Sequence, residues 1–137
     1  MSTYSEGRYL TFIADADLSA AANLYKIVSI AASTANTTGR KVVLSTSTTD
    51  HLIVGVLNNT PKAGEAASVT GRNSSGTFKV VAGANTASIS VGDQLTVDTD
   101  SGALKTTTAG DELIGIALEA AVAGQVFEYL PLNRLHA

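Results

Sequence analysis

At 137 residues the chain suits a single domain that can bury an apolar core, and its net charge of −3, with the basic residues scattered, argues against a nucleic-acid binder. The lack of cysteine excludes a disulfide framework, a thiolate zinc site and a cysteine nucleophile. No stretch is apolar over the length of a membrane span and the first residues do not form a secretory signal, so we expect an intracellular product without a membrane partner.

The N-terminal stretch is rich in aromatic side chains. Tyr4, Tyr9 and Phe12 are three of the seven aromatic residues in the chain, which has four Tyr, three Phe and no Trp. One interpretation is that Tyr9 and Phe12 fill the core from a first strand. The other is that an extended arm over residues 1–18 carries the aromatic rings onto a neighbouring subunit as interface anchors. The residues support both interpretations equally for Tyr9 and Phe12, and favour the arm for Tyr4.

The next part of the chain predicts short strands separated by polar loops. Residues 24–30 alternate in hydropathy as a strand does, and residues 41–45 and 52–57 are short apolar runs rich in β-branched side chains. A proline and paired asparagines predict a loop over residues 58–64. The alanines before residue 24 are too few for more than a short helical turn.

The remainder repeats this rhythm. Predicted strands cover residues 67–71 and 76–83 (as a hairpin around a polar turn), 86–92, 94–105 (strand, Asp-Ser-Gly turn, strand), 112–118 and 125–130. Short strands at roughly 8–12-residue spacing are typical of all-β barrels and sandwiches. We therefore predict an all-β fold, with a small β-barrel-like or β-sandwich domain over residues 19–137 and at most short helical turns.

Residues 52–66 and 112–126 echo each other at a shift of 60 residues. Gly55 matches Gly115, Gly64 matches Gly124, and aliphatic residues match aliphatic residues around the first pair. The echo indicates a weak internal duplication. Because the first copy contains a proline where the second reads LEAAVA, we predict that this run of helix formers is a loop between strands.

Residues able to carry catalysis are few. The two histidines, His51 and His136, stand alone in the sequence, and the paired acids at residues 15/17, 98/100 and 111/112 fall in turn-like segments where we expect solvated carboxylates. Residues 71–78 lack the lysine of a P-loop, and residues 98–109 lack the glutamate of a calcium loop. We therefore predict no catalytic residue, cofactor or metal site.

The order of these features resembles the small capsid cement, or head decoration, proteins of tailed bacteriophages. The resemblance rests on ADADLSAAANLYKIVSI, IVGVLNNTPKAGEAASV, FKVVAGA, VGDQLTVDTDSGAL and GDELIGIALEAAVAGQVFEYL, which together span about residues 12–132. Each motif is weak alone, and their order and spacing carry the similarity. The C-terminal PLNRLHA departs from the pattern.

The resemblance implies a structural protein on the outer surface of the virion, made in the host cytoplasm. Its expected partners are the major capsid protein, whose neighbouring subunits it would bridge, and further copies of itself in a homotrimer. Catalysis, a cofactor and nucleic-acid contact are not expected. The alternatives are a phage tail or fibre component and, less favoured, a carbohydrate-binding module or glycosidase-like enzyme that uses the scattered carboxylates.

Overall fold

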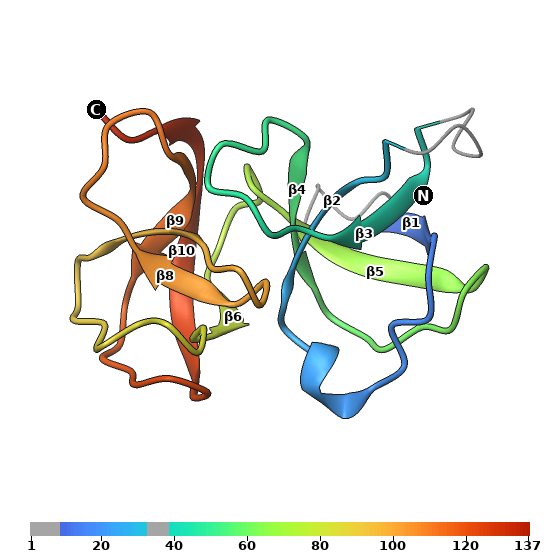
Figure 1. Ribbon diagram of the computed structural model, residues 1–137, viewed down its shortest axis with the longest axis horizontal. Helices are drawn as coiled ribbons and strands as arrows, with labels where there is room; N and C mark the ends of the chain where they lie inside the picture. The colour runs from blue at the N-terminus through green and yellow to red at the C-terminus, as the bar shows by residue number, and fades with distance from the viewer. Residues whose placement is uncertain (1–8, 33–38) are drawn as a thin grey trace.

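The computed structural model describes residues 9–32 and 39–137, and these residues form an almost entirely β structure of two halves that lie side by side (Figure 1). The first half holds β1 to β5 and the second half holds β6 to β10. The single helical element within those ranges is the three-residue 3-10 turn η1 (Ala21–Asn23). No helix in the described ranges has the length and apolar character needed to cross a membrane.

The first half is a closed five-stranded barrel in the order β1-β3-β2-β4-β5, with β5 returning to β1. Its strands are β1 (Leu10–Ala14), β2 (Ile27–Ile30), β3 (Lys41–Leu44), β4 (Ile53–Leu57) and β5 (Ala66–Gly71). All of its pairings are antiparallel except that of β1 with β3. Closure leaves no long unpaired edge in this half.

The second half is a five-stranded sheet in the order β6-β10-β9-β7-β8. Its strands are β6 (Phe78–Val81), β7 (Gln94–Val97), β8 (Ala103–Lys105), β9 (Glu112–Ala117) and β10 (Val126–Leu135). A single parallel bridge between Ala82 and Ala103 joins the ends of β6 and β8. The strands of this half therefore follow one another in the same order as those of the first half. Where β6 meets β8 only that one bridge closes the sheet, and we call this junction the seam of the second half.

The registers of the two halves correspond as well as their strand orders. Gly55 pairs with Gly71 across β4 and β5, and Gly115 pairs with Pro131 across β9 and β10, so both partners lie 60 residues further along. Glu65 and Gln125 make the same side-chain hydrogen bond in the two loops, from the backbone N–H three residues earlier. The glycines that precede them have φ of 83° and 82°. The predicted echo thus has a geometric counterpart in two hairpins of equal length.

The two halves share one apolar core. The larger cluster of buried side chains contains Ile27, Ile53 and Val56 from the first half together with residues of the second half such as Phe127 and Tyr129. A smaller cluster fills the barrel itself. Because apolar side chains of both halves exclude water from the same space, we treat the described residues as one packed body.

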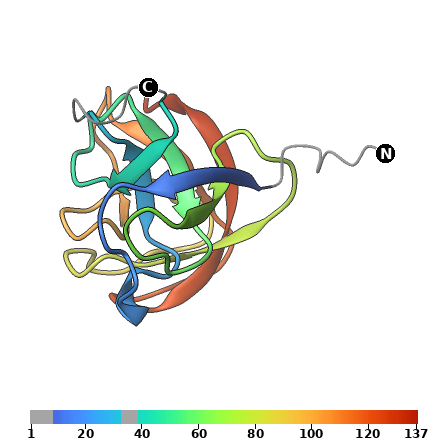
Figure 2. The same cartoon turned by 90° about the vertical axis from the view of Figure 1, so that its right-hand side faces the viewer.

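The all-β fold class and the loop over LEAAVA are confirmed, since residues 118–125 connect β9 to β10 without a helix. Other sequence predictions change. Residues 10–14 of the predicted 1–18 arm form β1, a barrel strand that crosses the face shown in Figure 2. Because their backbone pairs with β3 and β5, they are part of the barrel.

Two local predictions are wrong. Strands β5 and β6 do not form a hairpin, because β5 pairs with β1 and β4, whereas β6 pairs with β10. The polar turn between them is the connection from one half to the other. Residues 86–92 alternate in hydropathy but form no strand, and only Ile89 makes a bridge, to Ala121. Strand β10 also extends through most of the C-terminal segment, to Leu135.

Candidate interaction surface

A buried ion pair links the two halves. Arg72, directly after β5, donates from Nη1 to Glu112 Oε1 at 2.9 Å, and from Nε and Nη2 to the backbone carbonyl of Leu113 at 3.0 and 2.6 Å. A longer bond of 3.4 Å reaches the carbonyl of Arg134. The second oxygen of Glu112 lies 2.6 Å from Nδ1 of His51, whose side chain is largely exposed. The guanidinium thus holds the first half to β9 and β10.

Local sequence patterns do not reveal this ion pair. Arg72 stands in a segment that reads as a turn, and Glu112 was expected to be solvated, yet both are buried. A buried guanidinium is tolerated when its donors are satisfied, and here they meet a carboxylate and two carbonyls. Nothing in the sequence marks the partner of Arg72, which lies 40 residues away.

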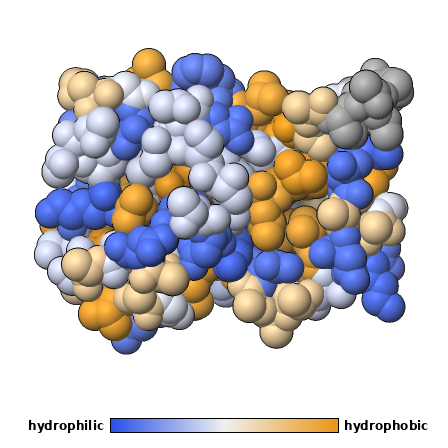
Figure 3. Space-filling view, in the orientation of Figure 1, coloured by the Kyte–Doolittle hydropathy of each residue, from blue (hydrophilic) through white to orange (hydrophobic). Residues whose placement is uncertain are grey.

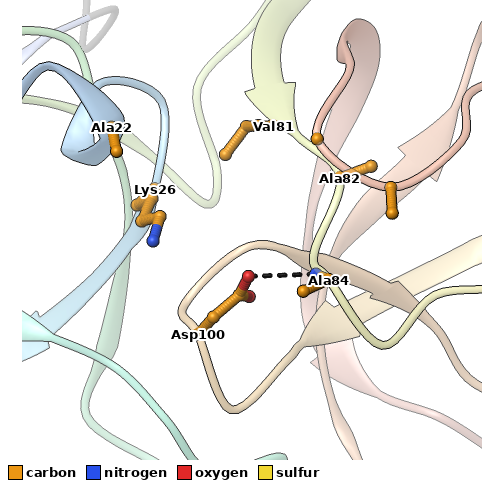
Figure 4. A pocket seen from close by; sticks show the side chains of 8 residues that line it. Ala22, Lys26, Val81, Ala82, Ala84 and Asp100 are labelled. Carbon is orange, nitrogen blue, oxygen red and sulfur yellow. Dashed lines mark hydrogen bonds between the residues drawn. The ribbon is translucent and has the colours of Figure 1, made fainter.

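A groove of about 440 Å³ runs between the two halves. Its lining includes Ala22 and Lys26 from the first half, and Val81, Ala82, Ala84, Asp100, Ala123 and Gly124 from the second half. Lys26 and Asp100 enter it from opposite sides (Figure 4). Asp100 is held by the backbone N–H of Ala84 at 2.9 Å. The small side chains leave room, and the two charged groups are the polar features of this groove.

The carboxylates of Asp98 and Asp100 are held by separate sets of hydrogen-bond donors. Asp98 is buried, and its oxygens accept hydrogen bonds from Asn85 and Thr99, whereas those of Asp100 accept from Ala84 and Gly102. Burial raises the pKa of Asp98, but the hydrogen bonds from Asn85 and Thr99 outweigh it and hold the pKa below its ordinary value. The expectation of solvated carboxylates is therefore wrong for Asp98, as it is for Asp111 and Glu112.

The hydroxyl of Thr106 donates to Asp111 at 2.5 Å. Hydrogen bonding from Ser19 lowers the pKa of the exposed Asp17. Within the described ranges, no three His, Asp or Glu side chains are arranged to hold a metal ion.

The structure separates the three predicted interface aromatics. Tyr9 is 51% exposed and packs edge-on against Phe78, with ring centroids 5.9 Å apart. Phe12 is half-buried and packs against the barrel core, which corresponds to the core interpretation. Tyr4 lies outside the described residues.

Several large apolar side chains are exposed on the described surface. They are Tyr9, Leu10, Ile13, Leu52, Val91, Leu118, Val122, Val126, Leu130 and Leu135. In the view of Figure 3, apolar residues gather over β3 and its neighbours in the first half, whereas the second half presents a more polar face. Where exposed apolar side chains gather on one face, that face is suited to contact with another macromolecule.

Comparison with protein families identifies the chain. The family model described as phage cement protein matches residues 22–131, which is most of the sequence. The chain belongs to the phage cement protein family. This cement protein is accordingly a phage structural protein, and the family expected from its motifs is confirmed.

Among solved structures, the cement protein is similar to the N base of head fiber gp8.5 of bacteriophage phi29. The two share 20% identity over 90% of this chain and 92% of that one, with a TM-score of 0.66, which shows a common fold. No curated protein matches the cement protein.

Proposed function

We propose that the protein binds the outer surface of the assembled phage head and stabilises it by bridging neighbouring subunits of the major capsid protein. The match to the phage cement family over residues 22–131 carries this proposal. The similar fold of the phi29 head fiber base, a protein named for its place on a phage head, also supports it. The role requires surface complementarity and no catalysis.

The physical basis is selective binding to the assembled shell. A protein that binds two adjacent subunits, and neither subunit alone with comparable strength, stabilises the assembly by mass action. Many copies on one shell add up without any single contact being strong. The shared core and the Arg72–Glu112 pair hold the halves together, so that the protein can transmit load between the subunits it bridges.

The N-terminal end is the part we propose to contact the shell. The ring of Tyr9 is held by Phe78 on one side and exposed on the rest, as interface anchors often are. Residues 1–8, which carry Tyr4, precede it directly. Phe12 is half-buried against the barrel core and offers a partner less exposed surface than Tyr9 does.

Self-association as a homotrimer is the second part of the proposal. Most soluble oligomers have closed symmetry, and a closed ring of copies presents several capsid contacts at once. The proposed location is the outer surface of the virion, after synthesis in the host cytoplasm. A head-fibre component is a second candidate, favoured by the similarity to a head fiber base.

Co-sedimentation with expanded empty heads tests the main proposal. We expect the wild-type protein to pellet with expanded heads and to stay in solution without them. Deletion of residues 1–8, or Tyr9→Ala, leaves β1 intact and should reduce the bound fraction about tenfold or more, because anchor residues dominate interfaces. Leu118→Ala, an exposed residue of the second half, is the matched control.

Full occupancy by both N-terminal variants would refute the proposed contact. A wild-type protein that never pellets with heads would refute the cement role. Electron microscopy of particles then separates the candidates, because a cement gives compact density on the shell and a fibre component gives density at the root of a projection.

A further inference from the structure

A segment of the first half is inserted into a seam of the second half. The backbone N–H of Val81 donates to the carbonyl of Tyr25 at 3.1 Å, and the N–H of Ile27 donates to the carbonyl of Ser101 at 2.8 Å. The segment Tyr25–Ile27 thus lies between β6 and the turn before β8. This insertion explains why β6 and β8 retain only a single bridge.

The matching seam of the first half is closed by a direct bond. Ile13 corresponds to Val81 and Arg40 to Ser101, as the pairings of Ala14 with Val42 and of Ala82 with Ala103 show. Here the N–H of Ile13 donates to the carbonyl of Arg40 at 2.8 Å. The seam of the first half therefore has one direct hydrogen bond. At the same place, the seam of the second half has two hydrogen bonds, and both involve the inserted segment.

The second half has its own counterpart of the inserted segment, at Gly92–Gln94. Tyr25 donates to the carbonyl of Leu57, and Gly92 donates to the carbonyl of Ala117, in the same way. Among the described residues, however, no hydrogen bond outside the strand ladders reaches the carbonyl of Gly92 or the backbone N–H of Gln94. These two groups correspond to the docked carbonyl of Tyr25 and N–H of Ile27, and in the second half no inserted segment bonds them.

The side chains beside the closed seam of the first half and beside the Gly92–Gln94 edge are complementary. Leu52, directly before β4, corresponds to Glu112 at the start of β9, and Leu132 follows Pro131 as Arg72 follows Gly71. The ion pair inside the molecule thus corresponds to two leucines, of which Leu52 is 45% exposed and Leu132 is half-buried. Beside the free edge, Val91 is 68% exposed. Apolar groups at both positions favour their burial against each other.

We propose that a second copy of the chain docks its Gly92–Gln94 edge on the β1–β3 seam of the first half, head to tail. The Gln94 N–H then donates to the carbonyl of Arg40, and the Ile13 N–H donates to the carbonyl of Gly92. One internal hydrogen bond is exchanged for two between copies, and Leu132 packs against Leu52.

This contact repeats between chains the contact that joins the two halves within one chain. It deepens the proposed self-association, on which it rests. A head-to-tail contact leaves one face free on each terminal copy, so that a closed ring forms when the rotation closes.

Charge exchange at the leucine pair tests the contact, with sedimentation equilibrium of the purified full chain as the measurement. Leu52→Glu and Leu132→Arg should each weaken association more than about tenfold, because each places an unpaired charge in the contact. The double variant rebuilds the pair found at Arg72 and Glu112 and should restore association. Val122→Glu, at a position that is 51% exposed and outside the contact, should leave association unchanged.

A cross-link tests the geometry without relying on the fold of the leucine variants. The chain has no cysteine, so Arg40→Cys with Gln94→Cys introduces one defined pair. Ile27 and Ser101 share a backbone hydrogen bond of 2.8 Å within one chain, and by analogy we expect residues 40 and 94 to come within disulfide reach between copies. The double variant should form covalent oligomers under oxidation, and either single variant should not.

Association unaffected by the leucine changes, or a double-cysteine variant that gives no covalent oligomer in solution or on heads, would overturn the contact. Wild-type binding to heads in that case would leave the cement role intact. Conversely, efficient cross-linking of a protein that never binds heads would leave the contact intact and refute the cement role.

Discussion

At Asp98 a buried carboxylate is kept ionised by its neighbours. The residue is 2% exposed, and the backbone and side-chain nitrogens of Asn85 donate to its two oxygens at 2.8 Å each. Gly83 makes this approach possible, because a Cβ at that position would lie 2.3 Å from the carboxylate. The turn between β7 and β8 is therefore fixed by polar contacts.

Acid should weaken the fold through this residue. The pKa of Asp98 is lower in the folded protein than its ordinary value near 3.9, so its ionised form contributes stability above that value. This contribution is lost as the pH falls through the lowered pKa. We expect the free energy of unfolding of the wild type to decrease over this acidic range more than that of Asp98→Asn. Urea titrations at pH 7 and at several acidic values measure it, and parallel pH profiles would contradict the expectation.

The sequence shows which chemical groups are present, but it predicts less well which of these side chains are buried and which are exposed. The aromatic cluster near the N-terminus is visible, but whether Phe12 faces the core depends on which strands flank it. The roles of Arg72 and Glu112 depend on a contact between two halves that local patterns do not encode. Solvation of a charged residue can be assumed from sequence only when no distant partner reaches it.

At the element scale, two glycines allow close approach of strands at equivalent places. A Cβ on Gly55 would lie 1.7 Å from the carbonyl oxygen of Thr70, and one on Gly115 would lie 2.2 Å from that of Leu130. Both neighbours are backbone atoms of the next strand in the hairpin. These positions exclude any side chain without a shift of the sheet.

Gly115→Ala should therefore destabilise the protein by about 3 kcal/mol or more, because the new methyl group overpacks a buried strand. Gly124→Ala is the control: its φ of 82° strains an alanine, but nothing lies within 4 Å of the added Cβ. We expect it to cost only about 1–2 kcal/mol. Chemical denaturation measures both variants. Equal losses in the two variants would contradict the steric cost expected at Gly115.

The strands were predictable as elements and less so as pairs. Runs of β-branched residues gave β3, β4 and β9 close to their observed bounds, and the proline in the first loop predicted correctly that LEAAVA is not a helix. Alternation alone predicted a strand at residues 86–92, where only Ile89 finds a partner. Hydropathy patterns indicate which face of a strand is buried, but the partner strand is chosen by tertiary packing.

At the scale of the whole molecule, the shared core predicts cooperative unfolding. Ile27, Ile53 and Val56 of the first half would lose their apolar neighbours if the second half unfolded. We expect one transition in urea, with the near-ultraviolet signal of the tyrosines and the far-ultraviolet signal of the strands coinciding. Two separated transitions would contradict this, as would a fragment of residues 1–74 that folds alone.

The all-β class was predictable for the whole molecule, because short apolar runs and frequent turns leave few alternatives. The division into two five-stranded halves was not predictable, because the echo between residues 52–66 and 112–126 covers only one hairpin of each half. The strands before these hairpins match in pairing while differing in sequence, for example LTFIA in β1 and FKVV in β6. Backbone registers correspond there although side chains have diverged.

One residue distinguishes a lasting contact from a reversible one. Tyr25 has φ of 67°, a conformation that costs a tyrosine roughly 1–2 kcal/mol, and its ring packs against the shared core. Its counterpart Gly92 has φ of 91° without strain and has no ring to bury. Withdrawal of the Tyr25 segment would expose an aromatic side chain to water, whereas withdrawal of the Gly92 segment from a partner would expose none. The first segment is therefore suited to stay in place for the lifetime of the fold, and the second, in the contact between copies that we propose, to dissociate and bind again.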